Sequence, residues 1–348
     1  MAKSGFLFFL LVAMGVGIGI AGSANAATYV GADKCLRCHP EEYNEWRVSG
    51  HPYKLRTAEE AKGASLPLPA GYTWDDISYV IGGYKWKVRY IGKDGFIITK
   101  TDGKPGKNQY NLETGTWSDY HPGEVKKYDC GGCHTTGYSK EGNQGDLEGI
   151  VGTWELRGIQ CEACHGPGSD HIAQGGDVSL IKLDRSSELC GQCHVRGSKD
   201  KIPASGGFIR HHEQYNELLA SPKKAFDCVS CHNPHKKAEF ALKQDCTTCH
   251  ATAKAGYEGS QMEKIGVRCI DCHMPKAVKS AVKFTNYEAD VRSHLFTINL
   301  DSEAKMFTAD GKFAQGYLTA EYACLSCHKD MDKEWALKKA KEVHSQGK

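Results

Sequence analysis

The 348-residue sequence contains no cysteine outside a Cys-X-X-Cys pair, and beyond residue 21 it contains no long apolar run. A transmembrane helix needs about 20 consecutive apolar residues, so we expect none in the rest of the chain. No run of basic residues interleaved with aromatic ones is present, which argues against a nucleic acid partner. A chain of this length ordinarily buries a large apolar core, so the scarcity of apolar runs indicates that something else fills much of the interior.

Each of the eight Cys-X-X-Cys pairs is followed directly by a histidine. In this motif the two thiols add to the two vinyl groups at one edge of a porphyrin, and the adjoining histidine binds the iron as its proximal ligand. The sequence therefore predicts eight covalently bound haem c groups. The cysteines and proximal histidines are Cys35, Cys38 and His39; Cys130, Cys133 and His134; Cys161, Cys164 and His165; Cys190, Cys193 and His194; Cys228, Cys231 and His232; Cys246, Cys249 and His250; Cys269, Cys272 and His273; and Cys324, Cys327 and His328.

Zinc sites, disulfides and chance are the alternatives to haem attachment. Histidine is about one residue in twenty here, so finding it by chance after all eight pairs has a probability of roughly one in twenty to the eighth power. A zinc ribbon needs two cysteine pairs per metal and gives no reason for an adjoining histidine. Disulfide frameworks belong to much shorter chains.

The first 26 residues have the pattern of a secretory signal peptide. Lys3 precedes an apolar run at residues 6–21, and Ala24-Asn25-Ala26 supplies the small residues of a cleavage site. An uncleaved membrane anchor is the alternative, but the run is short and rich in glycine. We therefore expect a mature chain that begins near Ala27, lies in the periplasm or at the cell surface, and has no membrane span.

The spacing of the motifs divides the chain unevenly. Between first cysteines, 95 residues separate Cys35 from Cys130 and 55 separate Cys269 from Cys324, whereas the six middle motifs crowd together. The expected fold is mainly α and irregular, with a haem-dominated core and a small antiparallel β insert at about residues 78–120. The predicted parts are a signal peptide at 1–26, an N-terminal haem segment at 27–60, a haem-free insert with β-hairpins at 61–125, a dense six-haem array at 126–280, and a C-terminal segment with the last haem and an amphipathic helix at 281–348.

The pattern of the insert predicts two hairpins. Residues 86–90 alternate, a turn follows at 93–95, and residues 96–99 return; residues 109–112 and 116–120 flank a second turn. The insert would shield haem faces, form a docking surface, or serve only as a structural cap.

Helices are expected at both ends of the mature chain. Pro40 is placed just inside a helix that ends near Gly50, with Tyr43 and Trp46 on one face. Near the C-terminus a Lys-rich amphipathic helix places His344 on its inward stripe. That position suits an iron ligand.

Eight further histidines remain, which equals the number of predicted haems. Only four methionines follow the cleavage site, so histidine is the expected distal ligand of each iron. A coincidence of counts, with one or two surface histidines, is the alternative. Bis-histidine ligation predicts low reduction potentials and no open iron, which favours electron transfer. The predicted distal ligands are His51, His121, His171, His211, His212, His235, His294 and His344.

Two of these contexts make specific predictions. His235 follows the proximal His232 by three residues, so it cannot readily reach the opposite face of the same haem and should serve a neighbouring one. His211 and His212 are adjacent, and in an extended segment they would point to opposite sides and reach different haems.

Several of the haem-bearing phrases resemble multihaem c-type cytochromes related to cytochrome c-554. The resemblance implies stacked haem pairs, distal histidines at His51, His171, His235 and His294, and a periplasmic or cell-surface role in anaerobic respiration. Redox partner proteins are then expected, either other cytochromes or membrane quinol-linked donors. The matching phrases are Cys35-Leu-Arg-Cys-His39 leading to Trp46-Arg-Val-Ser-Gly-His51, Cys161-Glu-Ala-Cys-His-Gly-Pro-Gly-Ser-Asp-His171, Cys228-Val-Ser-Cys-His-Asn-Pro-His235, Cys269-Ile-Asp-Cys-His-Met-Pro-Lys276 and Arg292-Ser-His294.

The same superfamily includes octahaem enzymes, so an oxidoreductase acting on a nitrogen or sulfur oxyanion at one open haem is the rival hypothesis. Relatives similar to pentahaem nitrite reductase carry a Cys-X-X-Cys-Lys motif, which is absent here. Hydroxylamine-oxidising relatives need an open iron and a crosslinked tyrosine. With sixteen tyrosines in the sequence, such a crosslink is not excluded. A subunit of an extracellular cytochrome filament is a third hypothesis. An electron carrier is the favoured function.

Overall fold

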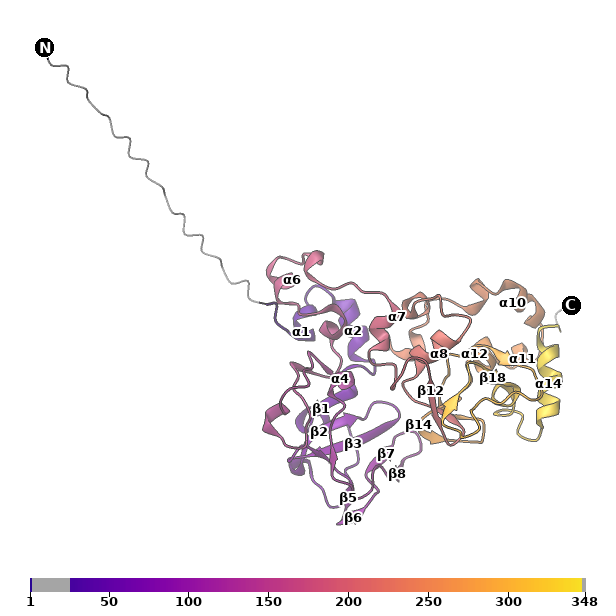
Figure 1. Ribbon diagram of the computed structural model, residues 1–348, viewed down its shortest axis with the longest axis horizontal. Helices are drawn as coiled ribbons and strands as arrows, with labels where there is room; N and C mark the ends of the chain where they lie inside the picture. Colours follow the sequence, from indigo (N-terminus) through magenta and orange to yellow (C-terminus); the bar gives the residue numbers. More distant parts are fainter. Residues whose placement is uncertain (2–25, 346–348) are drawn as a thin grey trace.

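The structure is a computed structural model that describes Met1 and residues 26–345 (Figure 1). The predicted signal peptide therefore lies almost entirely outside the described residues. Within the described ranges every helix is too short or too polar to cross a membrane. In Figure 1 the indigo-to-magenta part of the chain, with the larger sheet, lies at the left, and the orange-to-yellow part lies at the right.

The larger sheet is antiparallel and contains the predicted hairpins. It begins earlier and ends later than the expected insert, because Leu55 pairs with Ile81 and Ile97 pairs with Lys126. Leu55 and Ile81 are apolar and buried, so pairing closes an apolar cluster under the sheet. The strands are β1 (Leu55–Thr57), β2 (Ile77–Gly82), β3 (Lys87–Gly92), β4 (Phe96–Ile97), β9 (Lys126–Lys127), β7 (Gln109–Asn111) and β8 (Thr116–Ser118), in the order β1-β2-β3-β4-β9 with β7 on β3 and β8 on β7.

A second sheet of five strands was not predicted. Its strands come from distant parts of the chain, so no local pattern reveals the pairing, and β13 pairs with β14 in parallel. Asp290 fixes its bulge by accepting backbone hydrogen bonds from Ser280 and Ala281, both at 2.6 Å. The strands, in order, are β15 (Ala289–Val291), β14 (Val278–Lys283), β13 (Phe208–Arg210), β12 (Ile202–Ser205) and β17 (Phe313–Ala314).

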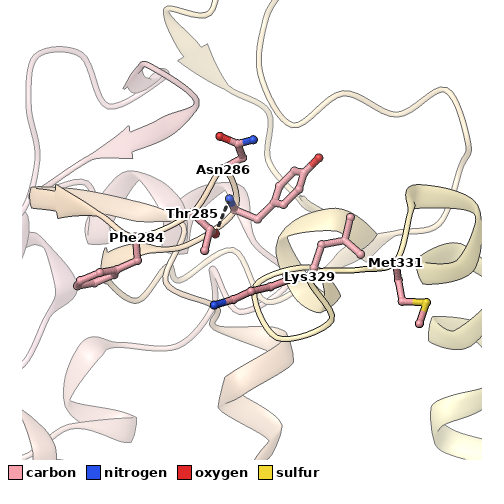
Figure 2. A pocket seen from close by; sticks show the side chains of 7 residues that line it. Phe284, Thr285, Asn286, Lys329 and Met331 are labelled. Carbon is pink, nitrogen blue, oxygen red and sulfur yellow. Dashed lines mark hydrogen bonds between the residues drawn. The ribbon is translucent and has the colours of Figure 1, made fainter.

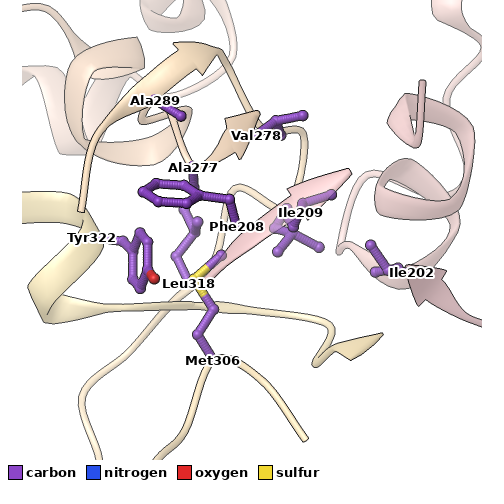
Figure 3. Packing of buried hydrophobic residues seen from close by; sticks show 10 residues of the cluster. Ile202, Phe208, Ile209, Ala277, Val278, Ala289, Met306, Leu318 and Tyr322 are labelled. Atoms are coloured by element: carbon purple, nitrogen blue, oxygen red, sulfur yellow. The ribbon is translucent and has the colours of Figure 1, made fainter. Parts of the chain in front are cut away.

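Apolar side chains pack against this second sheet, as Figure 3 shows. Phe208 and Leu318 are fully buried, and Phe208 meets Tyr322 edge to face at 6.1 Å between ring centroids. The Tyr322 hydroxyl donates to the carbonyl of Gly207. The haem-dominated core remains a prediction. The apolar clusters were not predicted from the sequence.

The two predicted terminal helices are present. Helix α2 (Pro40–Arg47) begins at the proline, as predicted. Helix α14 (Lys333–Glu342) is preceded by its N-cap Asp332, whose side chain accepts a hydrogen bond from the backbone N–H of Trp335 at 2.8 Å. His344 lies just beyond α14, in the 3-10 turn η7 (Val343–Ser345).

Candidate haem-binding sites

In several of the eight motifs a single helical turn brings the thiols and the histidine together. The backbone N–H of His39 donates to the carbonyl of Cys35 at 2.9 Å, and His194 does the same to Cys190. This i to i−4 bond closes one turn, so the cysteines and the histidine face one side. The short helices that contain motif residues include α1 (Ala32–Cys35), α4 (Gly131–His134), α5 (Cys161–His165), α7 (Ser187–Gly191), α9 (Cys228–Cys231), α12 (Cys269–His273) and α13 (Ala320–Cys324).

Every cysteine lies within the described residues, and none is bonded to another. Each Cys-X-X-Cys pair therefore retains both sulfur atoms for thioether bonds to a porphyrin, and the donor set fits haem c.

Five proximal histidines face a second histidine at the separation that an iron between them requires. Two imidazoles bound to one metal through bonds of about 2.0 Å place their ring centroids about 6 Å apart. The observed centroid separations span 6.0 to 6.4 Å. The pairs are His39 with His171 at 6.4 Å, His165 with His235 at 6.3 Å, His194 with His212 at 6.2 Å, His232 with His294 at 6.1 Å, and His273 with His344 at 6.0 Å.

Backbone carbonyls orient several of these rings. A carbonyl oxygen only accepts hydrogen bonds, so a ring nitrogen beside it carries the proton and the opposite nitrogen keeps its lone pair. The Nε2 atoms are thereby left to bind a metal. The contacts are His165 Nδ1 to Lys182 O at 2.8 Å, His171 Nδ1 to Asp177 O at 2.9 Å, and His273 Nδ1 to Phe296 O at 2.9 Å.

His235 faces the proximal histidine of the third motif. It follows its own proximal His232 by three residues, yet its ring stacks at 22° against His165. His235 therefore lies opposite the histidine of another motif, and its role as a ligand there remains a prediction.

Three predicted distal histidines, His51, His121 and His211, lie outside the five pairs. Burial and the neighbouring His194 lower the pKa of His51 to about 3. His121 is 39% exposed, with its Nδ1 atom 2.7 Å from Glu124. Their ligand roles remain predictions.

His211 and His212 are not in an extended segment. His212 has a φ of 74°, and the two rings lie 4.3 Å apart. The expectation that they point to opposite sides is therefore wrong, because the left-handed backbone at His212 turns both rings toward one region. The Nε2 atom of His211 lies 3.1 Å from an Arg196 guanidinium nitrogen.

Three motif histidines, His134, His250 and His328, face no second histidine at this separation in the described part of the chain. The ring of His328 packs on Trp335 at 4.6 Å. A pocket of about 360 Å³ borders this eighth motif through Leu325 and Lys329 (Figure 2).

His134 of the second motif lies among four cationic side chains. Burial lowers its pKa to about 3, and the charges of Lys54, Arg89, Arg196 and Lys87 add to that effect in this order. Its Nδ1 atom is shielded from solvent and has no hydrogen-bond partner. None of the four cations forms a salt bridge to a carboxylate within residues 26–345. The carboxylates of Asp290 and Glu213 act on Lys87 and Arg196 from farther away, so the second motif is next to four cations that none of these salt bridges neutralises.

Neutral groups hold two of these cations in place. The Nζ atom of Lys87 donates to the carbonyl of Ser280 at 2.6 Å. Arg89 donates twice to Gln109 Oε1, at 2.8 and 2.5 Å, and its guanidinium lies 3.4 Å from the centroid of the Tyr120 ring. Burial lowers the pKa of both side chains, to about 10 for Arg89. This cluster was not predicted from the sequence, although Lys87 and Arg89 share one face of the predicted strand at 86–90, which is a local sign of it.

The motifs are neighbours in a continuous series. The thiols of Cys35 and Cys161 are within hydrogen-bonding reach, as are those of Cys133 and Cys193 and those of Cys190 and Cys228. Helix α12 of the seventh motif packs on α13 of the eighth. Cys164 lies near the fourth motif, and Cys246 lies near both Cys231 and Cys269. The series therefore runs through motifs one, three, four, five, six, seven and eight, with the second motif branching from the fourth.

The chain was compared with known proteins. Residues 101–166 match the family model described as cytochrome c554 and c-prime. A multihaem cytochrome, MtrA, of Shewanella baltica is 30% identical over 135 residues, which are 34% of this chain and 36% of that protein. The dissimilatory sulfite reductase MccA of Wolinella succinogenes is 21% identical over 81% of this chain and 56% of its own length. The matches thus span about a third to a half of these two relatives.

Solved structures agree on the fold. The octahaem sulfite reductase MccA of Wolinella succinogenes aligns with a TM-score of 0.65 at 18% identity, over 86% of this chain and 65% of that one. The outer cell wall cytochrome OcwA aligns with a TM-score of 0.62 at 20% identity, over 89% of this chain and 86% of that one. These likenesses show a shared multihaem cytochrome fold.

Proposed function

We propose that this chain, a multihaem c-type cytochrome of the superfamily that includes cytochrome c-554, carries electrons through eight covalently bound haems in anaerobic respiration. Its donors and acceptors would be other cytochromes or membrane quinol-linked proteins. Two structural neighbours are named as outer cell wall and S-layer cytochromes, which supports a place in the periplasm or at the cell surface.

The unbroken series of neighbouring motifs carries this proposal. Thioether bonds fix one edge of each porphyrin at its two cysteines, so neighbouring thiols bring porphyrin edges close together. The paired imidazoles at five motifs would saturate those irons and keep their potentials low. Electrons would therefore move between the first and eighth motifs, which form the two ends of the series.

Removal of one end tests this path. The double substitution of Cys324 and Cys327 by serine removes the eighth attachment site, so the intact mass should fall from eight haems to seven. Rapid reduction from the first end should survive, while transfer to an acceptor that docks at the eighth haem should be lost. Unchanged transfer to every acceptor would contradict the proposed path.

A second function is favoured by the cations around His134. The cluster of Lys54, Lys87, Arg89 and Arg196 would bind a nitrogen or sulfur oxyanion, such as the sulfite named in one relative. A haem attached at the second motif would supply electrons and an iron that faces no second histidine. Haem propionates are the other anions that these cations could neutralise.

Lys87 and Arg89 would bind the oxyanion at such a site. Lys87 and Arg89 are fixed by neutral acceptors, so their positive charges remain available to an oxyanion. Half-buried ammonium and guanidinium groups in a low-dielectric region attract an anion more strongly than exposed ones. Burial lowers the pKa of Lys87, which would make its ammonium a better proton donor to a bound oxyanion.

Anion titrations of the oxidised protein separate the two functions. Sulfite or nitrite should bind with a change in the haem absorption of one haem, and Lys87→Met should weaken that binding roughly 10- to 100-fold, because a charged hydrogen bond contributes about 1.5–3 kcal/mol. Lys85→Met, at an exposed lysine of the same hairpin, is the matched control. No anion binding by the parent protein, or equal binding by both variants, would leave only the carrier function.

A further inference from the structure

His250 of the sixth motif is approached by a lysine instead of a second histidine. We propose that Lys223 supplies the sixth ligand to the iron held by His250, which gives this haem histidine–lysine ligation. The inference rests on the proposed attachment of haem at Cys246 and Cys249.

The contact is directed at the iron-binding nitrogen. The Nζ atom of Lys223 lies 2.8 Å from Nε2 of His250. A lysine ammonium can only donate, so the Nε2 atom accepts with its lone pair. That lone pair is the one that would bind the iron of an attached haem. Lys223 therefore lies beside the nitrogen that would coordinate an iron.

A modest movement converts this contact into coordination. Two nitrogens bound to one metal at about 2.0 Å each are about 4 Å apart, so the lysine nitrogen would retreat by roughly 1 Å. The flexible four-carbon stem of lysine allows such a change, and the amine would release its proton to water as it binds iron.

The backbone of Lys223 is held in place. Its N–H donates to Ser221 Oγ at 3.0 Å, and its carbonyl accepts from Phe226 N at 2.9 Å. Ser221 Oγ in turn donates to the carbonyl of Leu218 at 2.8 Å, which ties the turn to helix α8 (Gln214–Ala220). The tether limits where the side chain can go and keeps the amine near His250.

Competing partners for Lys223 are lacking. Among the described residues Lys223 forms no salt bridge to a carboxylate, and its other close neighbour is the Phe226 ring, 5.7 Å from Nζ. No histidine ring is paired with His250 there. The amine is therefore the group best placed to complete this coordination sphere.

Spin-state spectroscopy of the full holoprotein tests the proposal. In Lys223→Ala, electron paramagnetic resonance should show one additional high-spin haem per chain relative to the parent protein, and that haem should bind added imidazole and return to low spin. Lys223→His should keep the haem low-spin but move its near-infrared magnetic circular dichroism band to the bis-histidine position. Lys224→Ala, at the exposed neighbouring lysine, is the matched control and should match the parent.

The haem count separates the possible failures. All variants should retain eight haems by intact mass. A Lys223→Ala protein with eight haems and an unchanged high-spin content would overturn lysine ligation while leaving the electron-transfer function intact. A parent protein without haem on Cys246 and Cys249 would overturn both.

Discussion

Glu162 is the residue whose substitution should most clearly separate local haem geometry from global folding. This residue is 3% exposed and lies inside the third motif, between Cys161 and Cys164. It accepts backbone hydrogen bonds from Val30 at 2.9 Å, Gly31 at 2.8 Å and Gly168 at 2.7 Å. One side chain therefore joins the first and third motifs to the turn that precedes the predicted distal ligand His171.

The expected loss follows from these three contacts. A hydrogen bond to a charged group contributes about 1.5–3 kcal/mol, and Glu162→Ala also leaves three backbone donors without partners, so the local structure should lose roughly 5–8 kcal/mol. Glu162→Gln retains one acceptor oxygen and should lose about half as much. The motif itself is unchanged, so eight haems should still attach.

Hydrogen exchange and magnetic resonance measure this effect together. In Glu162→Ala, amide protection should fall at residues 28–33 and 166–172, and the haem bound at His39 should become high-spin as His171 moves away. Glu162→Gln should fall between this variant and the parent. Unchanged protection and spin state in Glu162→Ala would refute the claim that this carboxylate holds the two motifs together.

Three further predictions address other parts of the molecule. His344→Ala should convert the haem at His273 to high spin and let it bind cyanide, since the two rings are 6.0 Å apart, and optical titration would detect it. Phe208→Ala should cost about 3–5 kcal/mol because the ring is fully buried, and thermal unfolding with haems attached measures the loss. Burial raises the pKa of Glu217 to about 8, against an ordinary value of 4.5. The free energy of unfolding should therefore fall as the pH rises from about 4.5 to 8. Denaturant titrations measure this dependence, and Glu217→Gln should weaken it.

Local patterns were sufficient for much of the fold. The hairpin at 86–99 could be predicted because alternation and turn residues are local signals, and β3 and β4 occupy it. Helix α2 was predictable from Pro40 at its first position. The second sheet was not, since β13 pairs in parallel with β14, a strand nearly seventy residues later. Pairing at that distance depends on tertiary packing that no short window contains.

The candidate sites divide in the same way. The motif cysteines and histidines are fixed by spacing alone, whereas the partner of each proximal histidine depends on the folded chain. Counting histidines predicted one distal ligand per haem, and the structure brings five of them to iron-spanning distance. A count of residues could not show that Lys223 approaches His250 or that cations surround His134. Lysine and arginine are common in the sequence, and only the folded structure shows which of them lie beside a motif histidine.

A coulometric titration of the purified holoprotein tests the central claim most directly. An electron carrier with a haem at every motif should take up eight electrons per chain, reversibly and at low potentials, and return all of them to an oxidant. Uptake of fewer than eight electrons, or electrons that cannot be recovered, would contradict the account.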